Sequence, residues 1–218
     1  MNNYRKSAAW FIATWFILVC CVSGLQLYRN DSNRVGIAVA VSALTPIVVF
    51  GVWYMLSDGF RRFILGLKPR TLTYIQSWRL AGIIFIVLQA YGVLPGIFAL
   101  PAGYGDMAIG ATALFAASKL AVPKHRNSFL VWQLLGMADL VMAVGLGTTA
   151  RLASGGGPSM APMTMLPLSL IPTFIVPLLF IFHLICIAQA RRWRQRHLSE
   201  ADTFSYDLES GVGTRPLA

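Results

Sequence analysis

The sequence has few of the residues from which soluble active sites are built. Among 218 residues there are only 3 cysteines, 3 histidines and 8 acidic residues. There is no CxxC pair, no HExxH, no phosphate-binding glycine loop and no nucleophile elbow. These absences argue against zinc, nucleotide and serine-hydrolase chemistry of the soluble kind. An intramembrane enzyme or redox protein is the least favoured reading.

The three cysteines also give no disulfide framework. Cys20 and Cys21 fall in the outer half of the first apolar run, whereas Cys186 falls in the inner half of the last. Because these positions differ in depth, we expect buried, unreactive thiols. His183 and Cys186 share a helix face, but two ligands do not make a metal site. We therefore expect no metal and no cofactor.

Apolar residues, in contrast, are abundant. They make up 56% of the chain against 12% charged residues, and the mean hydropathy is +0.64, which is too apolar for a soluble domain of this size. Runs of about 18 or more apolar residues are long enough to cross a bilayer as helices. We expect an all-α polytopic membrane protein with one six-helix transmembrane domain over residues 1–190. The six runs cover residues 8–27, 35–56, 79–100, 104–121, 129–149 and 166–189. The first run resembles a signal peptide, but its length favours a retained helix.

The net charge of +10 is explained better by topology than by a nucleic-acid partner. With both termini cytoplasmic, the 18 Lys and Arg residues all fall on that side except Arg29, Arg34 and Arg151. This distribution is the positive-inside bias of membrane proteins. Indole rings prefer the membrane interface, and five tryptophans are predicted near the cytoplasmic boundaries. These are Trp10, Trp53, Trp78, Trp132 and Trp193.

Two cytoplasmic segments are predicted to contact lipid headgroups. In residues 59–69, an apolar face with i, i+3, i+4, i+7 spacing indicates a short helix lying on the membrane surface. Residues 191–218 are first basic and then acidic, which predicts a headgroup anchor followed by a disordered tail. The apolar face comprises Phe60, Phe63, Ile64 and Leu67. The expected headgroup contacts are Arg61, Arg62, Lys68, Arg191, Arg192 and Arg194.

Two aspartates lie inside apolar runs. An aspartate at the centre of a lone helix costs about 2.5–3.5 kcal/mol on insertion scales, so such residues normally face a protein interior or water. Asp139 is predicted near mid-membrane, and Asp106 only a turn from the outer end of its helix. Small residues stand three before and four after each acid, which permits close helix contact. We expect both acids to face one polar seam between helices 104–121 and 129–149.

Helix 79–100 is predicted to add a third stripe to this seam. Its Gln89 could hydrogen-bond to Asp139, and Pro95 is expected to kink the helix. Arg79, placed at the inner end, is expected to be too far in depth to pair with Asp139 and to snorkel to the headgroups. The predicted polar site is Asp139, Asp106, Gln89 and His183, the last being a structural histidine first and a proton relay second. The predicted packing glycines are Gly82, Gly92, Gly96, Gly103, Gly110 and Gly136.

The segment GVLPGIFALPAGYGDMAIG, residues 92–110, carries a family resemblance. It resembles uncharacterised bacterial multi-pass membrane proteins that share an ALPAG-(Y/W)-GD-like sequence. The resemblance covers the third to fifth helices at most. It implies a bacterial inner-membrane location and an all-helical fold, and it implies no activity.

Two functions fit these features. The first is a small transporter or proton-coupled permease, in which Asp139 gains and loses a proton and Asp106 lies at an outer entrance. The second is a non-catalytic scaffold, assembly factor or accessory subunit, in which the acids serve helix packing only. The depth of Asp139 favours transport. The expected partners are membrane lipids, a small solute or proton and, for the second function, another membrane protein.

Overall fold

The structure is a computed structural model that describes residues 2–29, 36–152 and 158–209, with side chains described for 4–29, 36–150 and 158–193. These parts of the chain are helical and contain no strand. The helices are α1 (Asn2–Gly24), α2 (Ile37–Leu56), α3 (Asp58–Leu65), α4 (Pro69–Ile75), α5 (Ile83–Ala90), α6 (Gly96–Phe115), α7 (Arg126–Leu152) and α8 (Val176–Glu209). The 3-10 turns are η1 (Gln76–Gly82), η3 (Pro123–His125) and η4 (Ala161–Thr164), and the π turns are η2 (Ala116–Leu120) and η5 (Ile171–Ile175).

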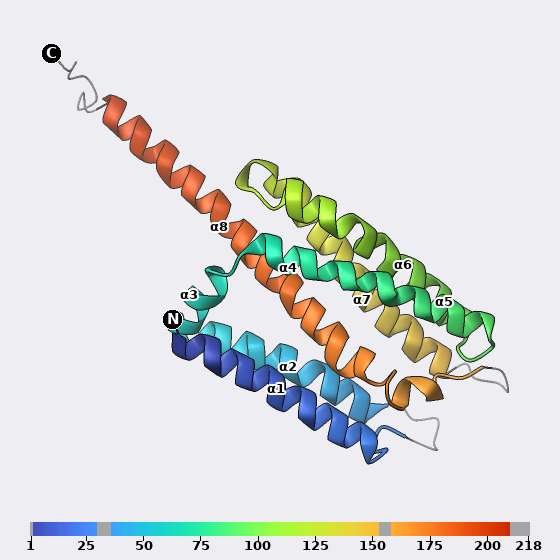
Figure 1. The fold of residues 1–218 in the computed structure, drawn as a ribbon. Helices are drawn as coiled ribbons and strands as arrows, with labels where there is room; N and C mark the ends of the chain where they lie inside the picture. The colour runs from blue at the N-terminus through green and yellow to red at the C-terminus, as the bar shows by residue number, and fades with distance from the viewer. Residues whose placement is uncertain (1, 30–35, 153–157, 210–218) are drawn as a thin grey trace.

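Within the described residues, six helical stretches are long and apolar enough to cross a membrane, so the prediction of an all-α fold with six spans is confirmed. They cover Tyr4–Gly24, Ile37–Leu56, Pro69–Ala90, Gly96–Leu120, Pro123–Ala150 and Ile171–Trp193. In Figure 1, α1 and α2 form one side of the bundle and α4 to α7 the other, and α8 passes between them. We call the end of the bundle that carries α3 and residues 121–125 the basic end, and the end that carries residues 91–95 and 158–165 the opposite end.

The third and fourth spans begin and end at other residues than predicted. The third span begins at Pro69 rather than at residue 79 and ends at Ala90. Proline suits the first turn of a helix because its fixed φ is helical and its missing N–H needs no partner there. Gly92 then adopts φ +69°, which favours glycine, and Pro95 is the N-cap of α6 instead of a kink. The fourth span accordingly starts at Gly96 instead of residue 104.

These shifted boundaries change the depth of the charged residues. Arg79 lies near the middle of the third span, where the chain tightens into the 3-10 turn η1. Asp106 lies well inside the fourth span, not one turn from its end. Trp78, predicted at a boundary, is also in mid-span and is 73% exposed. Arg79, Asp106 and Asp139 therefore occupy similar depths.

The apolar face of α3 packs against protein rather than lying on lipid. Phe60 and Ile64 are buried in a core cluster with residues of α2 and α8, and the Phe60 ring stacks on Trp53 with centroids 4.0 Å apart. Gln189 donates hydrogen bonds to the carbonyls of Ile64 at 3.2 Å and Leu67 at 2.8 Å, which closes the end of α3. The amphipathic pattern correctly predicted a helix, but the apolar face of that helix packs against the other helices of the bundle.

The cations predicted at the headgroups lie around the basic end. Arg61 pairs with Asp58, and Arg62, Lys68, Arg191 and Arg192 are all exposed or partly exposed. The side chain of Arg194 is outside the described part of the chain. The backbone of α8 continues as helix to Glu209, where a disordered tail was predicted. No proline or glycine interrupts residues 178–209, so the helix has no local reason to stop.

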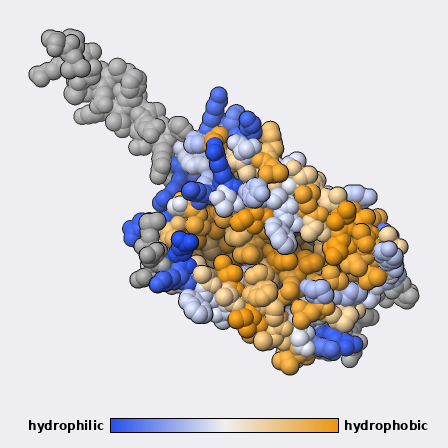
Figure 2. Space-filling view, viewed as in Figure 1, coloured by the Kyte–Doolittle hydropathy of each residue, from blue (hydrophilic) through white to orange (hydrophobic). Residues whose placement is uncertain are grey.

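The surface between the two ends is apolar. Figure 2 shows hydrophobic residues over the middle of the visible face and hydrophilic residues gathered toward its margins. Large apolar side chains such as Leu44, Leu114 and Val141 are more than half exposed. In water such a surface would be costly, whereas acyl chains cover it without cost.

Candidate functional site

Arg79 points into the bundle, where it joins the two intramembrane acids. The residue is only 3% exposed. Its Nε donates to Asp106 Oδ1 at 2.7 Å, its Nη2 donates to Asp139 Oδ2, and its Nη1 donates to the carbonyl of Gly136 at 3.1 Å. The prediction that Arg79 snorkels to the headgroups is wrong, because its span begins at Pro69 and places it at the depth of the acids. We call Arg79, Asp106 and Asp139 the ion cluster.

Glycines make room for the polar side chains of this region. A Cβ at Gly82 would lie 2.5 Å from Asp106 Cβ, and a Cβ at Gly105 would fall on the carboxylate of Asp139. A Cβ at Gly136 would fall on the His183 ring. Each of these three polar groups therefore rests against the bare backbone of a neighbouring helix. Gly105 was not among the predicted glycines.

The remaining predicted glycines divide into two kinds. A Cβ at Gly103 would lie 2.7 Å from Ile86 Cγ1, and one at Gly110 would lie 2.6 Å from the backbone nitrogen of Leu80. These two glycines allow α6 to approach the third span closely. At Gly92 no atom would lie within 4 Å, and at Gly96 the nearest would be Gln89 Cγ at 3.8 Å. Gly92 and Gly96 therefore belong to the turn that joins the spans.

His183 connects the ion cluster to a chain of polar groups. Its ring is fully buried, with Nε2 at 3.4 Å from Arg79 Nη1 and Nδ1 at 2.5 Å from Gln133 Oε1. Gln133 Nε2 donates to Thr73 Oγ1 at 3.2 Å, so its Oε1 is free to accept. The Nδ1–H tautomer of a neutral ring satisfies both contacts, because Nε2 then accepts from Arg79. Thr73 lies in the first turns of the third span, so this chain runs from the ion cluster toward the basic end.

Gln89 takes no part in the ion cluster. The described part of the chain shows no hydrogen bond between Gln89 and Asp139, and Gln89 instead lies beside Gly96 near the opposite end. The reason is again the span boundary, since α5 ends at Ala90 and puts Gln89 in its last turn. Gln133, Thr73 and Arg79 are the polar partners that sequence reasoning missed.

The ion cluster does not balance its own charge. One guanidinium carries +1 and two ionised carboxylates carry −2. Among the described side chains no second Lys or Arg pairs with either acid. Asp106 Oδ2 accepts no hydrogen bond within the described residues, and the Asp106 side chain keeps 17% of its exposure. An excess negative charge in a low-dielectric interior is costly unless a proton or another cation neutralises it.

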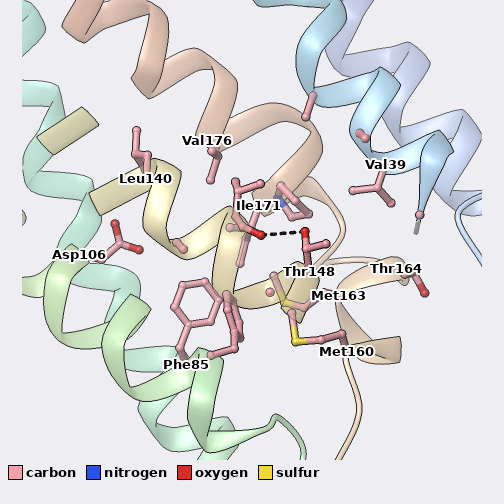
Figure 3. A pocket seen from close by; sticks show the side chains of 18 residues that line it. Val39, Phe85, Asp106, Leu140, Thr148, Met160, Met163, Thr164, Ile171 and Val176 are labelled. Atoms are coloured by element: carbon pink, nitrogen blue, oxygen red, sulfur yellow. Dashed lines mark hydrogen bonds between the residues drawn. The ribbon is translucent and has the colours of Figure 1, made fainter. Parts of the chain in front are cut away.

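A pocket leads to this unbalanced charge. It has a volume of about 160 Å³ and lies between α2, α6, α7 and residues 160–176, mainly in the half of the bundle nearer the opposite end. The described residues that line it are apolar except for Asp106, Thr148 and Thr164. Figure 3 shows Asp106 at one side of the pocket and Met160, Met163 and Thr164 at the other. The hydroxyls of Thr148 and Thr164 donate their protons to backbone carbonyls. Asp106 is the one charged residue among the described residues that line the pocket.

The cluster does not have the composition of a metal site. Among the side chains of residues 4–29, 36–150 and 158–193, no group of three His, Cys, Asp or Glu could hold a metal ion. The guanidinium group of Arg79 occupies the space between the two carboxylates in which a metal ion would otherwise lie. The arrangement is suited to exchanging a small cation, including a proton, at a carboxylate already held by an arginine.

Comparisons with known proteins place the chain in a family. No curated protein and no solved structure matches it. Residues 34–191 match the family described as Domain of unknown function (DUF8737). This match includes the second to fifth spans, all but the last two residues of the sixth, and every residue of the ion cluster. The chain therefore belongs to the DUF8737 family of proteins.

Proposed function

We propose that this protein is a small proton-coupled transporter of the inner membrane and that the ion cluster is its coupling site. The observation that carries the proposal is the access to the cluster from two directions. The pocket extends from near the opposite end to Asp106, and the chain His183, Gln133 and Thr73 extends from Arg79 toward the basic end. Intramembrane acids with such connections are typical of ion and proton pathways. The basic end faces the cytoplasm by the positive-inside rule.

The charge imbalance supplies a coupling mechanism. Arg79 holds both carboxylates on separate helices, Asp106 on α6 and Asp139 on α7. When a proton neutralises one of them, Arg79 pairs fully with the other. When the proton leaves, the guanidinium is shared again and α6 and α7 are drawn toward the third span. Proton binding can thus bias the packing of these helices, which a coupled transporter requires.

The proposal predicts that Asp139→Asn abolishes coupled flux without unfolding the protein. The amide keeps the shape and still accepts from Arg79, but it cannot exchange a proton. Proteoliposomes loaded with the pH dye pyranine measure proton movement when small amines, amino acids, sugars or carboxylic acids are added outside. We expect at least one solute class to drive proton flux in the parent, and Asp139→Asn to fall to the level of empty liposomes.

The matched control is Asp58→Asn, which removes an exposed acid at the basic end that pairs with Arg61. This variant should transport like the parent. A folded Asp139→Asn protein with the same proton flux as the parent would contradict the proposal. So would a parent protein in which no solute class drives proton flux.

The second candidate is a membrane scaffold or accessory subunit. One observation favours it: the backbones of Gly82, Gly105 and Gly136 fit closely against Asp106, Asp139 and His183. Such close packing is also expected of a polar cluster that only holds helices together. A scaffold predicts no solute-driven proton flux in the parent and a lower folded yield in both Asp106→Asn and Asp139→Asn.

A further inference from the structure

We infer that the pocket beside Asp106 binds a small lipophilic primary amine in its protonated form. The inference rests on the proposed function, which it deepens by naming the class of solute. Three properties of the pocket carry it: its charge, its size and the chemistry of its walls.

The charge of the pocket selects a cation. Among the described residues that line the pocket, Asp106 is the one with a charged side chain, and its Oδ2 accepts no hydrogen bond from them. The charged and titratable groups near Asp106 are Arg79 from η1, Asp139 from α7 and, on the other side of Arg79, His183 from α8. The described residues of α2 that line the pocket are all apolar. An ammonium group at Oδ2 would bring the cluster to zero net charge. An anion would meet the excess negative charge and be repelled.

The size and the lining of the pocket determine which apolar group the bound amine can carry. About 160 Å³ is close to the volume of an engineered apolar cavity of about 150 Å³ that binds benzene. Phe85 and Phe98 line it edge to face with centroids 5.4 Å apart, and Met160 and Met163 add two thioethers. Aromatic faces attract cations, and thioethers fit irregular apolar ligands. One ring with a short ammonium arm fits this description.

Amine binding and proton binding should be mutually exclusive. The excess charge of −1 is neutralised by one proton on a carboxyl group or by one ammonium ion at Asp106. Binding of the ammonium ion therefore releases the proton that the cluster holds, and charge is conserved. This exchange is the step that would couple amine movement in one direction to proton movement in the other.

The test is equilibrium binding of benzylamine to the purified full chain in detergent, measured by calorimetry in two buffers of different ionisation enthalpy. Benzyl alcohol and benzoate serve as neutral and anionic probes of the same size. We expect benzylamine to bind about tenfold or more tightly than benzyl alcohol. Both can donate a hydrogen bond to Asp106, but only the ammonium group also carries the positive charge that neutralises the carboxylate. Benzoate should show no binding, and the buffer dependence should report proton release with benzylamine only.

Three variants test whether benzylamine binds in this pocket. Gly147→Leu fills the pocket, since a Cβ there would lie 3.3 Å from Met160 Cε and 3.5 Å from Phe98 Cδ2. Gly145→Leu is its control on the same helix, because no atom lies within 4 Å of the corresponding Cβ. Gly147→Leu and Asp106→Asn should lose benzylamine binding by about tenfold or more, whereas Gly145→Leu should keep it.

The inference and the proposed function fail separately. Equal binding of benzylamine and benzyl alcohol, preference for benzoate, or unchanged binding in Gly147→Leu would overturn the inference. Proton flux driven by another solute class in a protein that does not bind benzylamine would retain the transporter and reject the amine. Binding of benzylamine without any proton flux would retain the amine site and reject the transporter.

Discussion

Arg79→Met should destabilise the folded bundle by about 3–5 kcal/mol, the usual effect of removing one partner from a buried ion pair. Methionine fills much the same volume but leaves two carboxylates facing each other at mid-membrane depth. The Arg79 side chain is 1% exposed, so water cannot replace its hydrogen bonds. The free energy of unfolding in mixed detergent micelles, followed during titration with SDS, measures the loss.

The control for this substitution is Arg61→Ala. Arg61 also pairs with an aspartate, but its side chain is 42% exposed and its partner Asp58 is 72% exposed. Exposed ion pairs contribute about 0–1 kcal/mol, so the control should stay within that range. A similar free energy for both variants would show that the burial of Arg79 has no energetic consequence.

Gly110→Ala should be the most damaging methyl addition among the glycines of α6. Its Cβ would lie 2.6 Å from the backbone nitrogen of Leu80 and 3.0 Å from the carbonyl carbon of Arg79. A backbone cannot rotate away as a side chain can, so α6 must move off the third span. Overpacking of this kind costs about 1–3 kcal/mol, and we expect the upper part of that range in the same unfolding assay.

Gly51→Ala on α2 is the matched control for this methyl group. No atom lies within 4 Å of its Cβ position, so alanine there should leave stability unchanged or raise it by up to about 1 kcal/mol through helix propensity. If both alanine variants behaved alike, the close approach of α6 to the third span would be refuted.

The sequence was sufficient for the number of spans but not for the bounds of the third and fourth or for the pairing of the charged residues. Hydropathy finds the helices because each must be apolar over its length. The third and fourth spans have the lowest mean hydropathies, 1.4 and 1.2, because they include the polar residues of the cluster and its surroundings. A search for apolar runs therefore started the third helix at residue 79 and assigned Arg79 to the membrane edge. The signal that could have corrected this was Pro69 following Lys68, which is a helix start.

The partners of the acids are set by contacts between helices, which periodicity does not reveal. The i−3 and i+4 pattern identifies Gly103 and Gly110 on the face of Asp106. Gly105 lies on another face of α6 and receives Asp139 from α7, so no spacing within one helix points to it. Gln133 likewise becomes recognisable only when α8 places His183 beside it.

The most direct test of the ion cluster is a double-mutant cycle between Arg79 and Asp139. The unfolding free energy is measured for the parent, Arg79→Met, Asp139→Asn and the double variant, and compared with the same cycle for Arg61 and Asp58. We expect Asp139→Asn alone to cost little, because it removes the excess charge, and to relieve part of the loss caused by Arg79→Met. A coupling of about 1.5 kcal/mol or more, with less than about 0.5 kcal/mol for the surface pair, is the predicted result. Additive effects within about 0.5 kcal/mol would contradict a shared buried cluster.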